Sequence, residues 1–386
     1  MKFTNTLAAI ALVASSQAAL AASQGVAENT VTFAQVAALG GPAAALGTGM
    51  QQGIIAAFEE VNRAGGVHGR MLKLESFDDG YEPDRSVQHV RDVIKGDAHI
   101  GFIGPVGTPT SKATQPVATE ANMPFVGPFT GAGFLRDASH GNIFNVRATY
   151  AAETEEWIRF LVDENGMKNI AILYQDDGFG RVGLAGVTAA LEKRGMSLAA
   201  EGTYTRNTTA VKSALLDIRK AKPDAVVMVG AYKPIAEFVK LSRKLKFNPT
   251  FVNISFVGSK ALAAELGEHG EGVIVSQVVP FPWDQSIPVV KQYQEALKAV
   301  DATAEPGFVT LEGYVVGRLA IEALAAAGKD LTRESYLASL AGLREVDLGG
   351  VVMSFGDNDN QGMDGVFLTR ITADGSFAPI VNGGNS

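Results

Sequence analysis

Hydrophobic residues gather in short runs that alternate with amphipathic stretches along almost the whole chain. The clearest strand-like runs are Val31–Ala37, Met71–Phe77, Ile100–Ile103, Ile170–Tyr174, Ala225–Val229, Phe251–Ile254 and Val273–Val278. Several of them, such as Ala225–Val229, are continuously apolar rather than alternating. Such runs are typical of strands that are covered by helices on both faces, so the pattern predicts parallel sheets between layers of helix.

The stretches between these runs have helical periodicity. In Gln51–Arg63 apolar residues recur at a spacing of 3.6, and glycines at 65 and 66 mark the end of the predicted helix. Ala210–Lys222 has the same pattern and is stopped by Pro223. This regular β-α order indicates right-handed crossovers between parallel strands.

The chain has more β-α units than one doubly wound sheet usually holds, so two such sheets are expected. Candidate crossings between them are Arg147–Tyr150, Val279–Trp283 and Arg344–Gly350; the middle one contains two prolines, which excludes a helix interior or a central strand. Open α/β sheets bind ligands beyond the carboxyl ends of their strands. Two lobes would therefore form a binding cleft where their strand ends meet.

The N-terminus has the pattern of a secretory signal peptide. Lys2 supplies a positive charge, Leu7–Ala14 is a short apolar run, and Ala19-Leu20-Ala21 forms an A-x-A cleavage site. A membrane anchor is the alternative, but the apolar run is well short of the roughly 20 residues that a spanning helix needs. We therefore expect residues 1–21 to be removed near Ala21-Ala22 and the mature protein to be periplasmic.

Composition and motifs exclude several functions. The chain has 41 acidic and 33 basic residues among 386, and its formal net charge of −8 disfavours nucleic-acid binding. Without cysteine there is no disulfide and no thiolate nucleophile. The glycines from Gly47 to Gly53 have the wrong spacing for a dinucleotide loop, and Asp78-Asp79 fits a turn or helix cap better than acid–base catalysis. We expect no enzyme, no metal and no cofactor.

A set of short segments resembles a known family in both order and spacing. They are Gly41-Pro42, Val61–Arg70, Phe77–Asp79, Ile103–Pro105, Thr114–Pro116, Pro124–Pro128, Ile170–Gly180 and Gly230–Tyr232. Together they resemble the leucine/isoleucine/valine-binding proteins, periplasmic receptors of ABC importers with the type I periplasmic binding protein fold. The resemblance covers essentially the whole mature chain.

This resemblance implies an α/β fold of two doubly wound parallel-sheet lobes joined by three crossover strands. Residues 22–147 and 281–345 would form the N-terminal lobe, and residues 148–280 and 346–386 the C-terminal lobe. A small-molecule ligand would be enclosed by a hinge motion. The partner would be an ABC transporter permease in the inner membrane, and we expect a monomer.

The resemblance also implies ligand-binding residues in the N-terminal lobe. Val106, Gly107 and Thr108 would supply backbone N–H groups and a hydroxyl to a ligand carboxylate. The local sequence agrees, because a glycine-containing turn that enters a helix offers donors and a favourable dipole to an anion. The adjacent contact segment is Phe129–Gly131, which comprises Phe129, Thr130 and Gly131.

Across the cleft the matching positions are Phe179 and Tyr232, and Leu46 would line the wall of the pocket. Packing alone is the alternative for Phe179, because aromatic residues fill many cores. Tyr232 follows a buried strand, where ligand contacts are expected. The last contact loop contains Ser255 and Phe256.

One position departs from the family. Amino-acid receptors of this type place a carboxylate where Ser255 stands, and that carboxylate pairs with the ligand ammonium. Either another acid, such as Asp177 or Glu312, supplies the charge, or the ligand lacks an α-ammonium. A branched-chain or other apolar amino acid and an aromatic or aliphatic carboxylate therefore both remain open, and a secreted α/β enzyme is the third alternative. Tyr81 and Gly107 stand where some members carry a disulfide.

Overall fold

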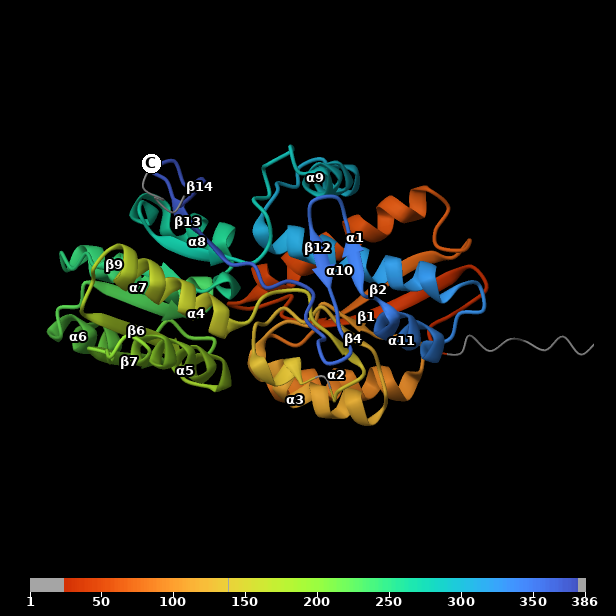
Figure 1. Cartoon of the computed structure of the whole chain (residues 1–386), viewed down its shortest axis with the longest axis horizontal. Helices are drawn as coiled ribbons and strands as arrows, with labels where there is room; N and C mark the ends of the chain where they lie inside the picture. Colours follow the sequence, from red (N-terminus) through yellow and green to blue (C-terminus); the bar gives the residue numbers. More distant parts are fainter. Residues whose placement is uncertain (1–23, 138, 381–386) are drawn as a thin grey trace, which may run out of the picture.

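Two α/β lobes lie side by side in the computed structural model, which describes residues 24–137 and 139–380 (Figure 1). The first lobe is built on a parallel five-stranded sheet in the order β2-β1-β3-β4-β5. Its strands are β1 (Thr30–Ala37), β2 (Met71–Asp78), β3 (Phe102–Ile103), β4 (Phe125–Val126) and β5 (Ile143–Phe144). The predicted signal peptide lies outside the described residues.

The second lobe has a seven-stranded sheet in the order β14-β13-β10-β9-β8-β6-β7. Its strands are β6 (Ile170–Gln175), β7 (Ala200–Tyr204), β8 (Ala225–Val229), β9 (Thr250–Asn253), β10 (Ile274–Gln277), β13 (Phe367–Ile371) and β14 (Phe377–Pro379). β6 to β10 are parallel, and β13 and β14 are antiparallel additions at one edge. The five parallel strands repeat the strand order of the first lobe, which confirms the predicted pair of doubly wound sheets.

Helices cover both sheets. Those that pack in the first lobe are α1 (Ala44–Arg63), α2 (Pro83–Gly96), α3 (Thr108–Glu120), α9 (Pro288–Val300), α10 (Phe308–Ala327) and α11 (Arg333–Gly342). Those of the second lobe are α4 (Tyr150–Ile158), α5 (Gly178–Glu192), α6 (Lys212–Lys220), α7 (Tyr232–Lys244) and α8 (Ser259–Leu266). Short helical turns are η1 (Gly133–Arg136), η2 (Arg159–Glu164), η3 (Ser255–Val257) and η4 (Gly267–Gly270). Within the described residues, no helix combines the length and the apolar character needed to cross a membrane.

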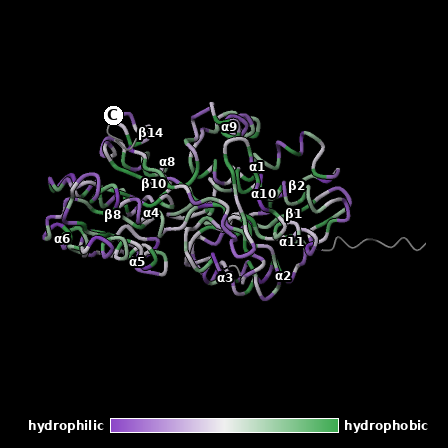
Figure 2. Tube along the Cα trace, viewed as in Figure 1, coloured by the Kyte–Doolittle hydropathy of each residue, from purple (hydrophilic) through white to green (hydrophobic). Residues whose placement is uncertain are grey.

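The cores lie between the sheets and their helices. Every residue of β6 and of β8 is buried, as the continuously apolar runs predict. Figure 2 shows hydrophobic positions concentrated along such strands and polar positions recurring on the outer helices. The strands are therefore held by burial on both faces, and their carboxyl ends are free to carry loops of other composition.

Helix α1 begins earlier than the sequence indicates. The predicted helix starts at Gln51, whereas α1 starts at Ala44 and contains Gly47 and Gly53. A Cβ on Gly47 would lie 2.0 Å from the carbonyl oxygen of Ala38, and one on Gly53 would lie 2.0 Å from that of Thr310. These glycines are therefore needed for close backbone packing, and they have no apolar side chain to extend the periodicity on which the prediction rested.

Within the described residues, the chain passes between the lobes three times. Two passages follow β5 and β10, near the predicted crossings. The third crossing was expected at Arg344–Gly350, but β11 (Glu345–Asp347) instead pairs with β12 (Val352–Ser354) in a hairpin. Gly350 packs on Ile287, just before α9, so the chain joins the second sheet only at β13. The lobe boundaries at residues 147, 280 and 345 themselves stay predictions.

Candidate functional site

The loops after the strands of the two lobes meet in the middle of the molecule. All eleven residues expected at the cleft are buried in this closed arrangement: Leu46, Val106, Gly107, Thr108, Phe129, Thr130, Gly131, Phe179, Tyr232, Ser255 and Phe256. Leu46 lies in α1, which follows β1, and the other ten residues follow β3 and β4 in the first lobe and β6, β8 and β9 in the second. The expected cleft is therefore a single interlobe region, and its residues divide into separate polar and aromatic groups.

Two hydroxyls of the first lobe meet at the start of α3. Thr108 Oγ1 and Thr130 Oγ1 are 2.6 Å apart, and both side chains are buried. Gly107, directly before α3, has a φ of 108°, which favours glycine. Val106 forms a bridge with Phe129, which ties the two loops together. The N-terminus of a 13-residue helix thus carries paired hydroxyls, an arrangement that suits an anionic group.

Tyr150 belongs to the same polar group, although the sequence did not single it out. Its backbone N–H donates to the Gly131 carbonyl oxygen at 2.8 Å, and its ring fills the space that a side chain at Gly131 would need. Burial raises the pKa of the Tyr150 phenol, and the positive charge of Arg147 and the nearby hydroxyls of Thr130 and Thr108 oppose that rise. The phenol therefore lies among the two threonines and a guanidinium.

Aromatic rings from both lobes pack around Phe256. Its ring centroid is 4.7 Å from that of Phe179, 5.3 Å from that of Phe129 and 5.9 Å from that of Tyr81. Phe179 also contacts Tyr150, at 5.5 Å. Since Phe129 and Tyr81 belong to the first lobe, the cluster joins the lobes through apolar contacts as well as polar ones.

Leu46 and Tyr232 lie together at another part of the interlobe contact. Both flank Gly258, where a Cβ would lie 2.6 Å from Leu46 Cδ2 and 3.8 Å from Tyr232 Cδ1. The Tyr232 hydroxyl also accepts from the backbone N–H of Ala45, across the lobes, at 3.4 Å. This pair is thus brought together by the structure, but it is separate from the threonine hydroxyls.

Ser255 is part of a buried charged network. Its backbone N–H and its Oγ both donate to the carboxylate of Glu153 at 2.8 Å, and Ser276 Oγ donates to the same carboxylate. Arg147 donates from Nη2 to Ser255 Oγ at 2.6 Å, and its Nε is 3.0 Å from Glu312 Oε1. Ser255 is therefore enclosed by the Glu153 carboxylate from α4 and the Arg147 guanidinium from the first crossover.

Burial sets the proton affinities in this network. Burial raises the pKa of Glu312 to about 7, against the opposing effect of Arg147 and with the help of Glu153. For Arg147 burial lowers the pKa, but Glu312, Tyr150 and Glu153 more than offset it, so the pKa is raised. Burial and the charge of Arg147 lower the pKa of Arg136 to about 9. Arg147 therefore stays charged.

Glu312 and Asp177, the two acids considered as partners for a ligand ammonium, both already have partners in the protein. Glu312 faces Arg147, as described above. Asp177 Oδ1 accepts the backbone N–H of Phe179 at the start of α5, and its Oδ2 accepts from Gln175 and from Arg206. The structure thus brings Glu312 and Ser255 to the same guanidinium, that of Arg147, and places Asp177 in another network.

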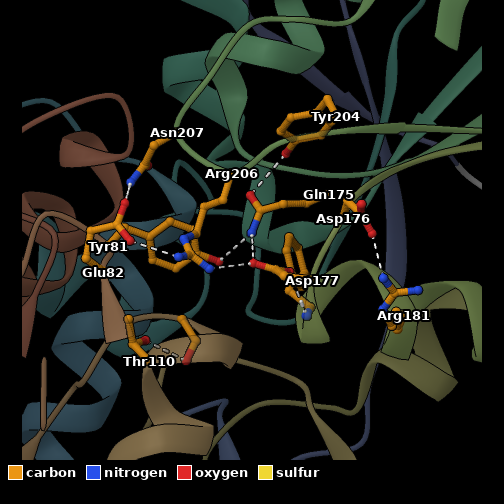
Figure 3. A network of polar contacts seen from close by, with 12 residues as sticks. Tyr81, Glu82, Thr110, Gln175, Asp176, Asp177, Arg181, Tyr204, Arg206 and Asn207 are labelled. Atoms are coloured by element: carbon orange, nitrogen blue, oxygen red, sulfur yellow. Dashed lines mark hydrogen bonds and ion pairs between the residues drawn. The ribbon is translucent and has the colours of Figure 1, made fainter. Parts of the chain in front are cut away.

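A second polar network joins the loops after β2 and β7, the strands at the sheet edges remote from the crossovers (Figure 3). Arg206 Nη2 is 2.8 Å from Glu82 Oε2, across the lobes, and Arg206 Nη1 is 3.1 Å from Asp177 Oδ2. Asn207 Nδ2 donates to Glu82 Oε1 at 2.7 Å and to the Gly80 carbonyl oxygen at 3.0 Å. We call Glu82, Asp177, Arg206 and Asn207 the outer network.

Tyr81 projects from the same turn into the cleft. It is buried with a φ of 64°, an uncommon conformation for a residue other than glycine, and the Asp79 carboxylate accepts its backbone N–H at 2.8 Å. A Cβ at Gly107 would lie 2.3 Å from Tyr81 Cε2. The Tyr81 hydroxyl accepts from Gln175 of the other lobe at 3.5 Å. Tyr81 and Gly107 thus pack together where a disulfide was considered for some family members.

Four cleft residues were not predicted as site residues: Tyr81, Arg147, Tyr150 and Glu153. Arg147 and Tyr150 were interpreted only as the ends of a crossing. The sequence feature that could have indicated these residues was Arg147 itself, a charged residue between the apolar residues Val146 and Ala148. Among the described residues, no group of three metal-ligating side chains is arranged to hold a metal ion. The arrangement provides hydroxyl and guanidinium donors beside apolar surface, which is the chemistry of a binding site.

The whole chain is similar to known binding proteins in sequence and in fold. The curated "Leu/Ile/Val-binding protein homolog 7" of Brucella abortus is 23% identical over 368 residues, covering 91% of each chain. A solved structure of a possible leucine/isoleucine/valine-binding protein from Rhodopirellula baltica is 36% identical, with a TM-score of 0.87, and covers 92% of this chain and 96% of that one. A fatty acid ABC transporter substrate-binding protein from Thermomonospora curvata shares the fold, with 22% identity, a TM-score of 0.84 and 93% of each chain covered. The pattern of one family, described as periplasmic binding protein, matches residues 30–376, and the chain therefore belongs to the periplasmic binding proteins, with relatives of the leucine/isoleucine/valine-binding type.

Proposed function

We propose that the protein is the periplasmic solute-binding component of an ABC importer and holds a small apolar molecule with a carboxylate group between its lobes. The observation that carries the proposal is the pair of buried hydroxyls of Thr108 and Thr130 at the start of α3, beside the aromatic cluster around Phe256. The hydroxyls suit the carboxylate, and the aromatic rings suit an apolar remainder. Closure by a hinge motion would then deliver the loaded receptor to a membrane permease.

A branched-chain or other apolar amino acid is the first candidate ligand, because the names of the relatives refer to leucine, isoleucine and valine. An aromatic or aliphatic carboxylate without an α-ammonium is the second candidate. It is favoured by the neutral Ser255 and by the carboxylate of Glu153, which already accepts from Ser255 and Ser276.

A thermal-shift panel of apolar amino acids and their deaminated analogues on the mature protein, followed by calorimetry of the hits, tests the function. Binding stabilises the folded state in proportion to ligand occupancy, so a true ligand raises the melting temperature. Tight binding without turnover would also separate a receptor from a secreted enzyme. A panel in which no apolar carboxylate, with or without an amino group, stabilises the protein would contradict the proposal.

Two substitutions locate the cleft. Thr108→Ala and Tyr232→Ala are each expected to weaken binding by about 1–3 kcal/mol, the usual consequence of losing a buried polar partner. Thr372→Ala, in the turn between β13 and β14, is the matched control and should leave the affinity unchanged. Wild-type affinity in both cleft variants would place the ligand elsewhere.

A further inference from the structure

We infer that the ligand is an apolar monocarboxylate without an α-amino group, because the protein's own Arg147 holds the place that a ligand cation would take. This inference rests on the proposed function and names its substrate class. It concerns the buried region between the loops of Phe129 and Ser255 and the start of α3.

The Arg147 guanidinium is buried between residues of the two lobes. Its carbon Cζ is 4.5 Å from the ring centroid of Phe129, and its Nη2 donates to Ser255 Oγ at 2.6 Å. The side chain is 1% exposed. Because both of these contacts are residues expected to touch the ligand, the guanidinium is next to the ligand's expected position.

Two hydrogen-bond donors near the Arg147 guanidinium lack acceptors in the described part of the protein. Among the described residues, Arg147 Nη1 and the Tyr150 hydroxyl are buried and have no hydrogen-bond partner. The Tyr150 phenol lies near the hydroxyls of Thr108 and Thr130 and near the positive charge of Arg147, without a hydrogen bond to any of them. A buried donor without an acceptor is unfavourable, and a carboxylate provides about four acceptor positions on two oxygens. A ligand carboxylate would therefore satisfy groups that the protein leaves unpaired.

A ligand ammonium has no comparable place. Both oxygens of Glu153 accept from Ser255 and Ser276, and Glu312 is paired with Arg147. An ammonium beside Ser255 would face the guanidinium of Arg147 at close range, with both charges removed from water. The amino group of an amino acid would thus lose hydration and gain a like charge as its neighbour.

The remainder of the ligand is expected to be apolar. Phe129 packs on the guanidinium, and Phe256 contacts both Phe129 and Phe179, so the side chains next to Arg147 offer ring faces and edges rather than hydrogen bonds. A branched aliphatic chain or an aromatic ring would replace part of these ring-to-ring contacts when the lobes close.

Calorimetry with matched pairs tests the inference on the full mature protein. The pairs are leucine with 4-methylpentanoate and phenylalanine with 3-phenylpropanoate, which differ only in the α-amino group. In at least one pair the acid without the amino group is expected to bind tighter by about tenfold or more. Equal or tighter binding of the amino acids would overturn the inference and leave the proposed function intact. Binding of none of the four would contradict both.

Removing one hydroxyl provides a second measurement. Tyr150→Phe deletes a buried hydroxyl without a protein acceptor, so the fold should persist while the affinity for the preferred acid falls by about tenfold. Tyr336→Phe is the matched control, because Tyr336 in α11 also has a buried hydroxyl without a partner among the described residues, and it belongs to the core of the first lobe. Unchanged affinity in Tyr150→Phe, or an equal loss in Tyr336→Phe, would overturn the inference.

Discussion

Two polar networks join the lobes, and they differ in how much water reaches them. In the network around Arg147, at the first crossover, the side chains of Arg147 and Glu312 are 1% and 3% exposed. In the outer network, the side chains of Arg206 and Glu82 are 22% and 43% exposed. Water can replace the partners of the outer ion pair but not those of the buried one. The buried network is therefore expected to stay assembled in every state, while the outer network can open and close.

The largest effect should follow from removing the buried cation. Arg147→Met leaves Glu312 and Glu153 buried without their counter-charge, so we expect the free energy of unfolding to fall by about 3–5 kcal/mol. Urea unfolding of the mature protein measures this value. The double variant Arg147→Met with Glu312→Gln should be more stable than Arg147→Met alone, because one of the uncompensated charges is also removed. A loss below about 1 kcal/mol in the single variant would mean that the network does not support the fold.

The second largest expected effect is the change in the free energy of unfolding with pH. Because burial raises the pKa of Glu312 from 4.5 to about 7, the folded protein retains a proton that the unfolded chain releases between these pH values. The free energy of unfolding is therefore expected to fall as the pH rises through this window, by up to roughly 3 kcal/mol from this group. Comparing urea unfolding at several pH values between wild type and Glu312→Gln isolates the contribution. The same slope in both proteins would exclude Glu312 as its source.

The smallest effect belongs to the outer network. Arg206→Ala removes a half-exposed ion pair across the lobes, so ligand affinity should fall by about 0.2–1 kcal/mol, less so at high salt, with little change in unfolding. Arg181→Ala is the matched control, because Arg181 pairs with Asp176 at 2.6 Å within the second lobe. If both variants lost the same affinity, the outer network would have no specific part in closure.

The fold could be predicted because burial on both faces of a strand leaves a readable pattern. The run Ala225–Val229 coincides with β8, and β6 extends its predicted run by a single residue. The early start of α1 could not be predicted, since Gly47 serves a close backbone contact with Ala38 and adds nothing to the apolar periodicity that marks the rest of the helix. The β11–β12 hairpin was missed because its position depends on packing against the start of α9.

The candidate site was less predictable than the fold. The threonines at 108 and 130 follow from the rule that ligands bind beyond strand ends, and the structure brings their hydroxyls together. Arg147 and Glu153 come from a crossover and a helix, which that rule does not cover. Tyr81 packs between the lobes from a turn in which its φ is positive, a conformation that a tyrosine in a sequence does not indicate. Long-range charge pairing and local backbone conformation account for these omissions.

The contact of Tyr81 with Gly107 also bears on how the protein can be handled. The turn that carries Tyr81 is secured by ring packing and by the Asp79 carboxylate, and the chain contains no cysteine. Thiol reagents therefore have no bond to cleave there, and folding needs no oxidant. Material folded in a reducing cytoplasm should therefore bind its ligand as tightly as material folded under oxidising conditions.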